Sequence, residues 1–286
     1  MKKSKGSEKI ILNIERAFCY IILILLSILC LFSFYVLIIN TTRSHPDIAK
    51  GFSLIPGKSI LVNLNNLLNN AQLPVLSGLL NSLIISTISA ALATYFSTLT
   101  AFAIHAYDFK FKKYAFGFIM MIMMIPTQVS ALGFVKLMSD MGLMNSFIPL
   151  TVPTIASPII FFFMKQYMES ALPMDLVEAA RIDGAREFRI FNQIVLPIMK
   201  PAIAVQAIFT FVSAWNNYFI PALLLNKDGK KTLPILIAQL RGADFLKFDM
   251  GQVYMLIALA ILPVIIVYLI LSKNIVRGIT LGSVKG

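Results

Sequence analysis

Six long stretches of the chain contain no Asp, Glu, Lys or Arg and consist mainly of apolar residues. A helix needs about 20 apolar residues to cross the roughly 30 Å of hydrocarbon in a bilayer, and each stretch is close to that length or longer. None of them shows the sustained period-two alternation of a half-buried strand. The pattern therefore predicts an all-α, polytopic membrane protein whose six transmembrane helices cover residues 17–39, 76–104, 114–135, 146–164, 201–225 and 251–271.

The composition excludes several other classes of protein. Apolar residues make up 58% of the chain and charged residues 13%, whereas a soluble domain carries about 25% charge. A soluble enzyme, a disordered chain and a disulfide scaffold are therefore excluded. The net charge of +12 does not indicate a nucleic-acid partner, because the basic residues lie between the apolar stretches. Cys19 and Cys30 both lie in the first stretch, and no Cys or His cluster has the spacing of metal ligands.

The distribution of Lys and Arg predicts the orientation in the membrane. With the N-terminus inside, the inner segments carry sixteen of these residues and the outer segments carry nine. Inner loops of membrane proteins are enriched in Lys and Arg. We therefore expect a cytoplasmic N-terminus at 1–16, a six-helix domain over 17–272, a cytoplasmic loop at 165–200 and a cytoplasmic tail at 273–286.

Small residues recur at every fourth position of the second stretch. Such residues let two helix backbones approach closely in lipid, which predicts that this helix packs against protein. The alternative is an alanine-rich helix that faces lipid. The two sets of small residues are Ser82, Ser86, Ala90 and Thr94, and Ser89, Ala93, Ser97 and Ala101.

Prolines within the stretches, such as Pro126, predict bends in their helices.

The inner loop at 165–200 predicts a short helix over about 173–183. Pro173 is suited to the first position of a helix, and Gly184 is suited to follow the last one. At 100° per residue, four small or apolar residues share one side of this segment: Leu172, Leu176, Ala179 and Ala180. Glu178 and Arg181 lie away from that side and are spaced to form an i,i+3 ion pair.

This loop resembles the EAA loop of bacterial ABC importer permeases. The match consists of Glu178-Ala179-Ala180, Gly184, Ile194 and Leu196-Pro197 at the spacing of that motif. The chain is most similar to the smaller permease subunit of the maltose/multiple-sugar type. Three other segments extend the resemblance over nearly the whole chain: Leu80-Asn81-Ser82, Ala214-Trp215-Asn216-Asn217, and the tail from Val276 to Gly286.

The resemblance implies a function and a set of partners. The chain would be a permease subunit that imports a sugar, expected to be an oligosaccharide, across the plasma membrane of a bacterium. Its partners would be a cytoplasmic ATPase dimer, a second homologous permease and an extracellular sugar-binding protein. The chain would be no enzyme and would bind no cofactor, because ATP and Mg²⁺ are used by the ATPase.

The resemblance also implies roles for particular residues. Glu178, Ala179, Ala180 and Gly184 would seat in a cleft of the ATPase, and Ile194, Leu196 and Pro197 would join this element to the fifth transmembrane helix. Four tail residues would contact the ATPases: Gly282, Val284, Lys285 and Gly286. The outer loop at 226–249 would contact the binding protein.

Other interpretations of these features stay open. The 173–183 helix could instead lie on the inner membrane surface. Four residues could line the substrate path or could merely bond neighbouring helices: Ser213, Trp215, Asn216 and Asn217. The transported solute could be another neutral or polar compound. A different class of function is a six-span channel or scaffold protein.

Overall fold

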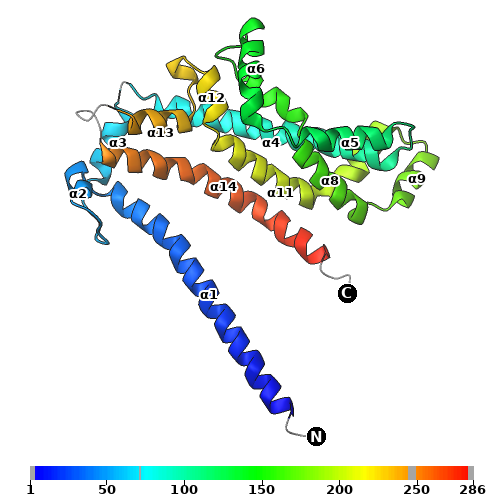
Figure 1. The fold of residues 1–286 in the computed structure, drawn as a ribbon, viewed down its shortest axis with the longest axis horizontal. Coiled ribbons are helices and arrows are strands. Elements are labelled where there is room, and N and C mark those ends of the chain that lie inside the picture. The colour runs from blue at the N-terminus through cyan, green and yellow to red at the C-terminus, as the bar shows by residue number, and fades with distance from the viewer. Residues whose placement is uncertain (1–3, 71, 244–248, 283–286) are drawn as a thin grey trace. The chain divides into compact units, whose positions relative to one another are not determined.

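The computed structural model describes residues 4–70, 72–243 and 249–282, and every regular element in these ranges is helical (Figure 1). Five helical stretches are long and apolar enough to cross a membrane: Leu12–Thr41, Val75–Ala106, Ile148–Ala171, Glu187–Trp215 and Met250–Ser272. A sixth span is possible if two bent helices are counted together. The predicted all-α architecture of a multi-span membrane protein is therefore confirmed.

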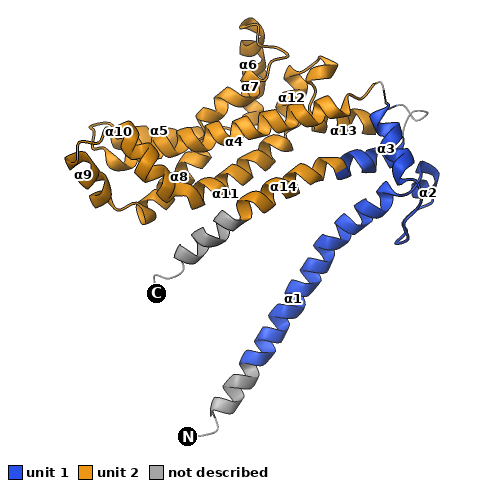
Figure 2. Cartoon of the chain, turned by 180° about the vertical axis from the view of Figure 1, so that it is seen from behind, with its two compact units in different colours: residues 1–69, 243–258 blue, residues 70–242, 259–286 orange. Residues whose placement is uncertain are grey.

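The chain divides into two compact units, coloured separately in Figure 2. The first comprises residues 1–69 and 243–258. It contains α1 (Ser4–Thr41), α2 (His45–Ala49), α3 (Ile60–Leu68) and the first turns of α14 (Met250–Gly282). Buried Asn63 of α3 donates to the carbonyls of Thr41 and Arg43, at 2.8 and 2.9 Å, and so holds α3 against the end of α1.

The second unit is organised around α4 (Val75–Ala106), a helix whose small residues are buried as predicted. All eight residues of the two sets are at most 7% exposed. The helices α8 (Pro158–Ala171) and α11 (Leu196–Trp215) pack along α4. Short side chains permit this close approach. They also bond the neighbouring backbone, since Ser89 donates to the Leu150 carbonyl at 3.2 Å and Ser97 to that of Ser157 at 3.4 Å.

The third predicted span is broken rather than continuous. It forms α5 (Lys112–Ile122) and α6 (Thr127–Asp140), which are bent by 94° relative to one another. Pro126 lies in the break with extended backbone, because its ring cannot continue a helix and its nitrogen cannot donate. The fourth span likewise begins with two short turns, α7 (Ile148–Thr151) and η1 (Val152–Ile155), before α8.

The fifth predicted span has different bounds from those expected. Its helix begins with α10 (Glu187–Ile190), continues through the π-helical η2 (Phe191–Val195) and ends with α11 at Trp215. Residues 216–218 interrupt it before α12 (Phe219–Leu224). The loop predicted at 226–249 contains two further helices, η3 (Asp228–Lys230) and α13 (Leu233–Arg241). Periodicity alone did not indicate these short helices.

Candidate coupling site

We call the 165–200 loop the coupling loop, and its contacts with the C-terminal end of α4 the coupling site. The short helix of the loop is α9 (Met174–Ile182), close to the predicted bounds. Pro173 precedes the helix as its N-cap, with extended backbone, instead of forming its first turn. Asp175 lies in the first turn and Arg181 in the last, so both charges complement the helix dipole. The sequence therefore determines both ends of this helix locally.

Gly184 ends α9 in a Schellman motif. The amide of Ala185 donates to the Ala180 carbonyl and the amide of Gly184 donates to the Arg181 carbonyl, both at 3.0 Å. Gly184 has a φ of +78°, a conformation that residues with a Cβ rarely adopt. No atom lies within 4 Å of the place where a Cβ would be, so the requirement for glycine comes from the backbone angle and not from crowding.

The side of α9 that packs against the protein differs from the predicted one. Val177 and Ala180 are buried, whereas Leu176 and Ala179 face outward. The helical wheel had placed Leu172, Leu176, Ala179 and Ala180 on one side. Leu172 and Ala180 are buried as expected, but packing against the rest of the unit turns the buried face toward Val177 and away from Leu176 and Ala179. The exposed face therefore carries Leu176, Ala179 and Ile182 beside Glu178, and Ile182 is 86% exposed.

The predicted Glu178–Arg181 pair is replaced by a pair with Glu187. Arg181 donates to Glu187 from Nε at 2.8 Å and from Nη2 at 3.3 Å, and its guanidinium lies 5.2 Å from the centre of the Tyr107 ring. The hydrogen bond to Glu187 raises the pKa of Arg181. Burial, followed by the bond to Glu187, raises the pKa of Tyr107. These contacts tie α9 to α10 and to the end of α4.

A π-helical segment, η2, joins the coupling loop to α11. The amide of Leu196 donates to the carbonyl of Phe191, five residues earlier. Pro197 has no amide hydrogen, so the helical hydrogen bond that residue 197 would donate cannot form. The π-helical turn lies directly before this missing bond. Phe191 is buried and packs edge-on against the Tyr95 ring of α4, 5.5 Å away. Leu196 and Pro197 thus lie where α4 contacts the start of α11, whereas Ile194 faces α9.

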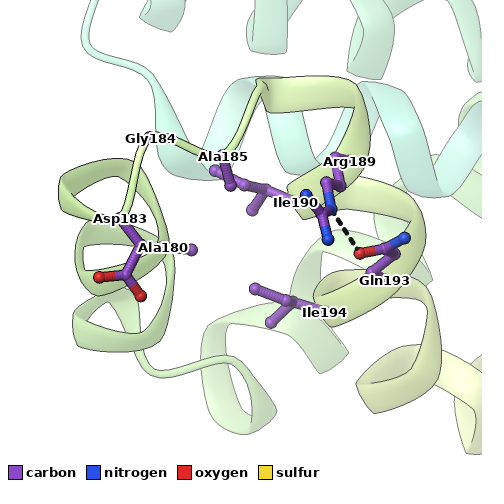
Figure 3. A pocket seen from close by; sticks show the side chains of 8 residues that line it. All are labelled: Ala180, Asp183, Gly184, Ala185, Arg189, Ile190, Gln193 and Ile194. Atoms are coloured by element: carbon purple, nitrogen blue, oxygen red, sulfur yellow. Dashed lines mark hydrogen bonds between the residues drawn. The ribbon is translucent and has the colours of Figure 1, made fainter.

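A pocket of about 370 Å³ separates α9 from the helix that follows it (Figure 3). It is lined by three of the residues that the resemblance assigns to ATPase docking or to the link with the fifth helix, namely Ala180, Gly184 and Ile194. The structure therefore brings together residues that are up to fourteen positions apart. Arg189 donates to Gln193 at 2.8 Å on the side of the pocket that lies opposite α9. Glu178 and Ala179 lie outside the pocket, on the exposed face of α9.

The candidate substrate-path residues fall into two groups. Trp215 is 3% exposed, donates from Nε1 to the Ala260 carbonyl at 3.1 Å, and stacks on Phe211 with the ring centres 5.6 Å apart. Its indole ring is therefore buried between helices in this conformation and does not line an open path. Ser213, Asn216 and Asn217 are exposed.

The candidate tail residues are only partly described. Gly282 ends α14, whereas Val284, Lys285 and Gly286 lie outside the described residues.

Sequence reasoning missed Tyr107 and Asn145. Tyr107 follows α4 directly and contacts Arg181, 74 positions later. Asn145 has a φ of 57° and bonds the backbone 81 positions away. The preference of Asn for left-handed turns is a signal at Asn145, but neither partner can be read from local sequence.

The fold and the EAA element together define the membrane-spanning component of an ABC importer. The chain matches the family described as "Binding-protein-dependent transport system inner membrane component" over residues 97–281. The chain belongs to this family. It is therefore a multi-pass inner-membrane permease component and is not itself a catalytic subunit.

Several relatives are similar along most of their length. The arabinooligosaccharides transport permease AraQ of Bacillus subtilis is 33% identical over 92% of this chain and 93% of its own. The lactose transport permease LacG of Rhizobium radiobacter is 29% identical, with 93% and 95% covered. The sn-glycerol-3-phosphate transport permease UgpE of Yersinia pestis is 29% identical, with 92% and 95% covered.

A solved structure shares the fold. It is the crystal structure of a bacterial ABC transporter involved in the import of the acidic polysaccharide alginate. Its matching chain aligns with a TM-score of 0.77 at 22% sequence identity, covering 91% of this chain and 96% of that one.

Proposed function

We propose that this chain is one of two homologous permease subunits of a bacterial sugar importer, and that α9 docks into a cleft of a cytoplasmic ATPase. Closure of an ATPase dimer on ATP moves α9, and the two permeases then change between inward-facing and outward-facing states. An extracellular binding protein delivers the sugar. ATP and Mg²⁺ are held by the ATPases, and this chain contributes the path and the docking element.

The exposed face of α9 carries the docking proposal. Leu176 and Ile182 leave large apolar surfaces uncovered beside Glu178, on a helix whose other face is packed. An amphipathic helix of this kind fits a groove on a partner protein. The Gly184 turn and the Arg181–Glu187 pair hold α9 on its own unit, so a push on α9 acts on α10 and α4.

The choice of a sugar rests on the relatives and on the polar residues near the end of α11. Two of the relatives named above are permeases for arabinooligosaccharides and lactose, which favours an oligosaccharide. Ser213, Asn216 and Asn217 are exposed and carry hydroxyl or amide groups that can bond sugar hydroxyls. The relative named for sn-glycerol-3-phosphate keeps another small polar solute as the alternative.

The topology follows from the docking role. If α9 is cytoplasmic, both termini are cytoplasmic as well, and the N-terminal end of α4 lies on the extracellular side. The loop at 226–249 then faces the binding protein, and the C-terminal end of α14 lies on the same side of the membrane as the ATPases. The excess of Lys and Arg on the inner segments supports this orientation.

Reconstitution tests the proposed function directly. The chain is co-expressed with its partner permease and ATPase and is reconstituted in lipid nanodiscs. We expect ATP hydrolysis to rise when the sugar-loaded binding protein is added, and cysteine cross-links to form between α9 and the ATPase. Solute flux through the purified chain alone would instead establish a channel, and labelling of α9 from outside the cell would refute the docking role.

A further inference from the structure

The 225–233 segment, between α12 and α13, is held by an asparagine at its first end. Asn145, between α6 and α7, accepts hydrogen bonds at Oδ1 from the amides of Asn226 and Lys227, at 2.7 and 2.8 Å. The backbone amide of Asn145 donates to the carbonyl of Leu224 at 2.9 Å. The φ of 57° at Asn145 lies in the left-handed region, where Asn is among the few residues that are tolerated.

A second asparagine holds the other end of the segment. Asn81 of α4 donates from Nδ2 to the carbonyls of Gly229 and Lys231, at 3.0 and 2.9 Å. Both hydrogens of its amide nitrogen are thus used. The next residue, Ser82, accepts at Oγ from the amide of Leu233 at 2.9 Å. Asn81 is 8% exposed and Ser82 2%, so these bonds are shielded from water.

Packing on α4 reinforces these bonds. Gly78 lies one turn before Asn81 and Ser82, and a Cβ at Gly78 would lie 2.5 Å from Cδ1 of Leu236 in α13. The missing side chain therefore lets α13 lie directly against α4. Leu233 and Leu236 are fully buried in this contact. The 225–233 segment is consequently fixed to α4 by side-chain bonds and by the helix that follows it.

The uncovered side of the segment is basic. Lys227 and Lys230 are exposed, and Lys230 lies 4.7 Å above the centre of the Phe147 ring. Lys231 forms an ion pair with Asp228 at 2.6 Å, and the two charges cancel. The net positive charge of the segment therefore comes from Lys227 and Lys230. A fixed basic surface favours an acidic partner and speeds its association.

We propose that Asn81, Ser82 and Asn145 are positioning residues, which hold the 225–233 segment as a rigid basic surface for an acidic face of the extracellular binding protein. The inference rests on the proposed function, because that function places this end of α4 outside the cell. The same helix reaches Tyr107 and the coupling site about 40 Å away, at 1.5 Å per residue. Movement of α4 therefore carries the segment with it.

Two substitutions of Asn145 distinguish the effect of its side-chain hydrogen bonds from the effect of its positive φ. Asn145→Asp keeps the acceptor and tolerates a positive φ, whereas Asn145→Gly keeps the backbone and removes the acceptor. Hydrogen–deuterium exchange of the 225–233 amides is measured in the assembled complex in nanodiscs. We expect exchange to be at least about tenfold faster in Asn145→Gly and close to the unmodified protein in Asn145→Asp. Equal exchange in both variants would overturn the positioning role.

The binding-protein concentration that half-maximally stimulates ATP hydrolysis tests the basic surface. We expect this concentration to rise about tenfold in Asn145→Gly and in the charge reversal Lys227→Glu with Lys230→Glu, with the rate at saturation retained. Added salt should raise it in the unmodified protein and should affect the reversed variant less. Faster exchange with an unchanged half-maximal concentration would overturn the proposal, and so would an unchanged charge-reversed variant.

The two readouts also separate this proposal from the proposed function. If the unmodified complex does not respond to the sugar-loaded binding protein, the proposed function fails and the assignment of the partner fails with it. The exchange measurement needs no binding protein. It therefore establishes or refutes the role of Asn145 in either case.

Discussion

The two ends of α4 are built from contacts of different range. At its C-terminal end, the ion pair and the turn of the coupling site join residues a few positions apart, such as Arg181 and Glu187, and ring contacts with Tyr107 and Tyr95 add to them. At its N-terminal end, Asn81 and Ser82 bond residues 148 to 151 positions away. Local contacts require little loop closure, whereas distant ones form only after several helices have packed. Local bonds thus set the ends of α9, whereas the bonds of Asn81 and Ser82 at the other end of α4 depend on assembly of the whole unit.

Charge reversal at the coupling site should have the largest functional effect. Glu178 is exposed on α9, and Glu178→Lys should lower sugar-dependent ATP hydrolysis and transport by more than about tenfold, since a cleft that receives a carboxylate would then meet a charge of the opposite sign. The amount of protein in the membrane should not change. Transport assays with Glu178→Gln as the uncharged control check this, and normal transport by Glu178→Lys would exclude the docking role.

Removal of one hydroxyl at the other end of α4 should destabilise the protein. Ser82→Ala leaves the buried amide of Leu233 without its acceptor, at a cost of about 1–3 kcal/mol. Thr87→Ala removes a hydroxyl from an exposed position of the same helix and is the matched control, with an expected change below about 0.5 kcal/mol. Thermal unfolding in detergent compares the two. Equal melting temperatures would show that the distant bond contributes no stability.

Substitution of the glycine after α9 should act locally. Gly184→Ala forces a Cβ into the left-handed region, at a cost of about 1–2 kcal/mol, although space is available. Gly133→Ala in α6 is the control, because its Cβ also meets open space and its φ is ordinary. Hydrogen exchange at Ala185 should increase in the first variant only. An unchanged rate there would mean that the Schellman turn tolerates the substitution.

The Arg181–Glu187 pair should have the smallest effect. The two side chains are 31% and 42% exposed, so the coupling energy from a double-mutant cycle of Arg181→Gln and Glu187→Gln should be below about 1 kcal/mol. Because the pKa of Arg181 is raised, the contribution of its charge is present at all lower pH values and is lost only as the pH rises through that pKa. Stability measured between about pH 6 and 9 should therefore show no titration of the pair. A coupling energy above about 2 kcal/mol would contradict this weak role.

Local signals in the sequence predicted the parts of the molecule that depend on local physics. The apolar stretches predicted the spans, because a bilayer sets the length of a helix that crosses it. The fourth-residue repeat of small residues predicted the buried side of α4. Gly184 predicted the end of α9, since a left-handed residue is required there whatever surrounds it.

Only the tertiary structure decided which groups meet. Val177 rather than Leu176 faces inward, because packing against the rest of the unit sets the rotation of α9. Arg181 bonds Glu187 rather than Glu178, because the Gly184 turn brings α10 back toward α9 and the Tyr107 ring lies beneath the guanidinium. In the sequence, Asn81 belongs to a segment that carries the family resemblance but has no indicated partner, and Asn145 is an ordinary polar residue. Their roles appear only when α4, the α6–α7 turn and α13 have packed, since each bonds a backbone segment that local periodicity cannot place.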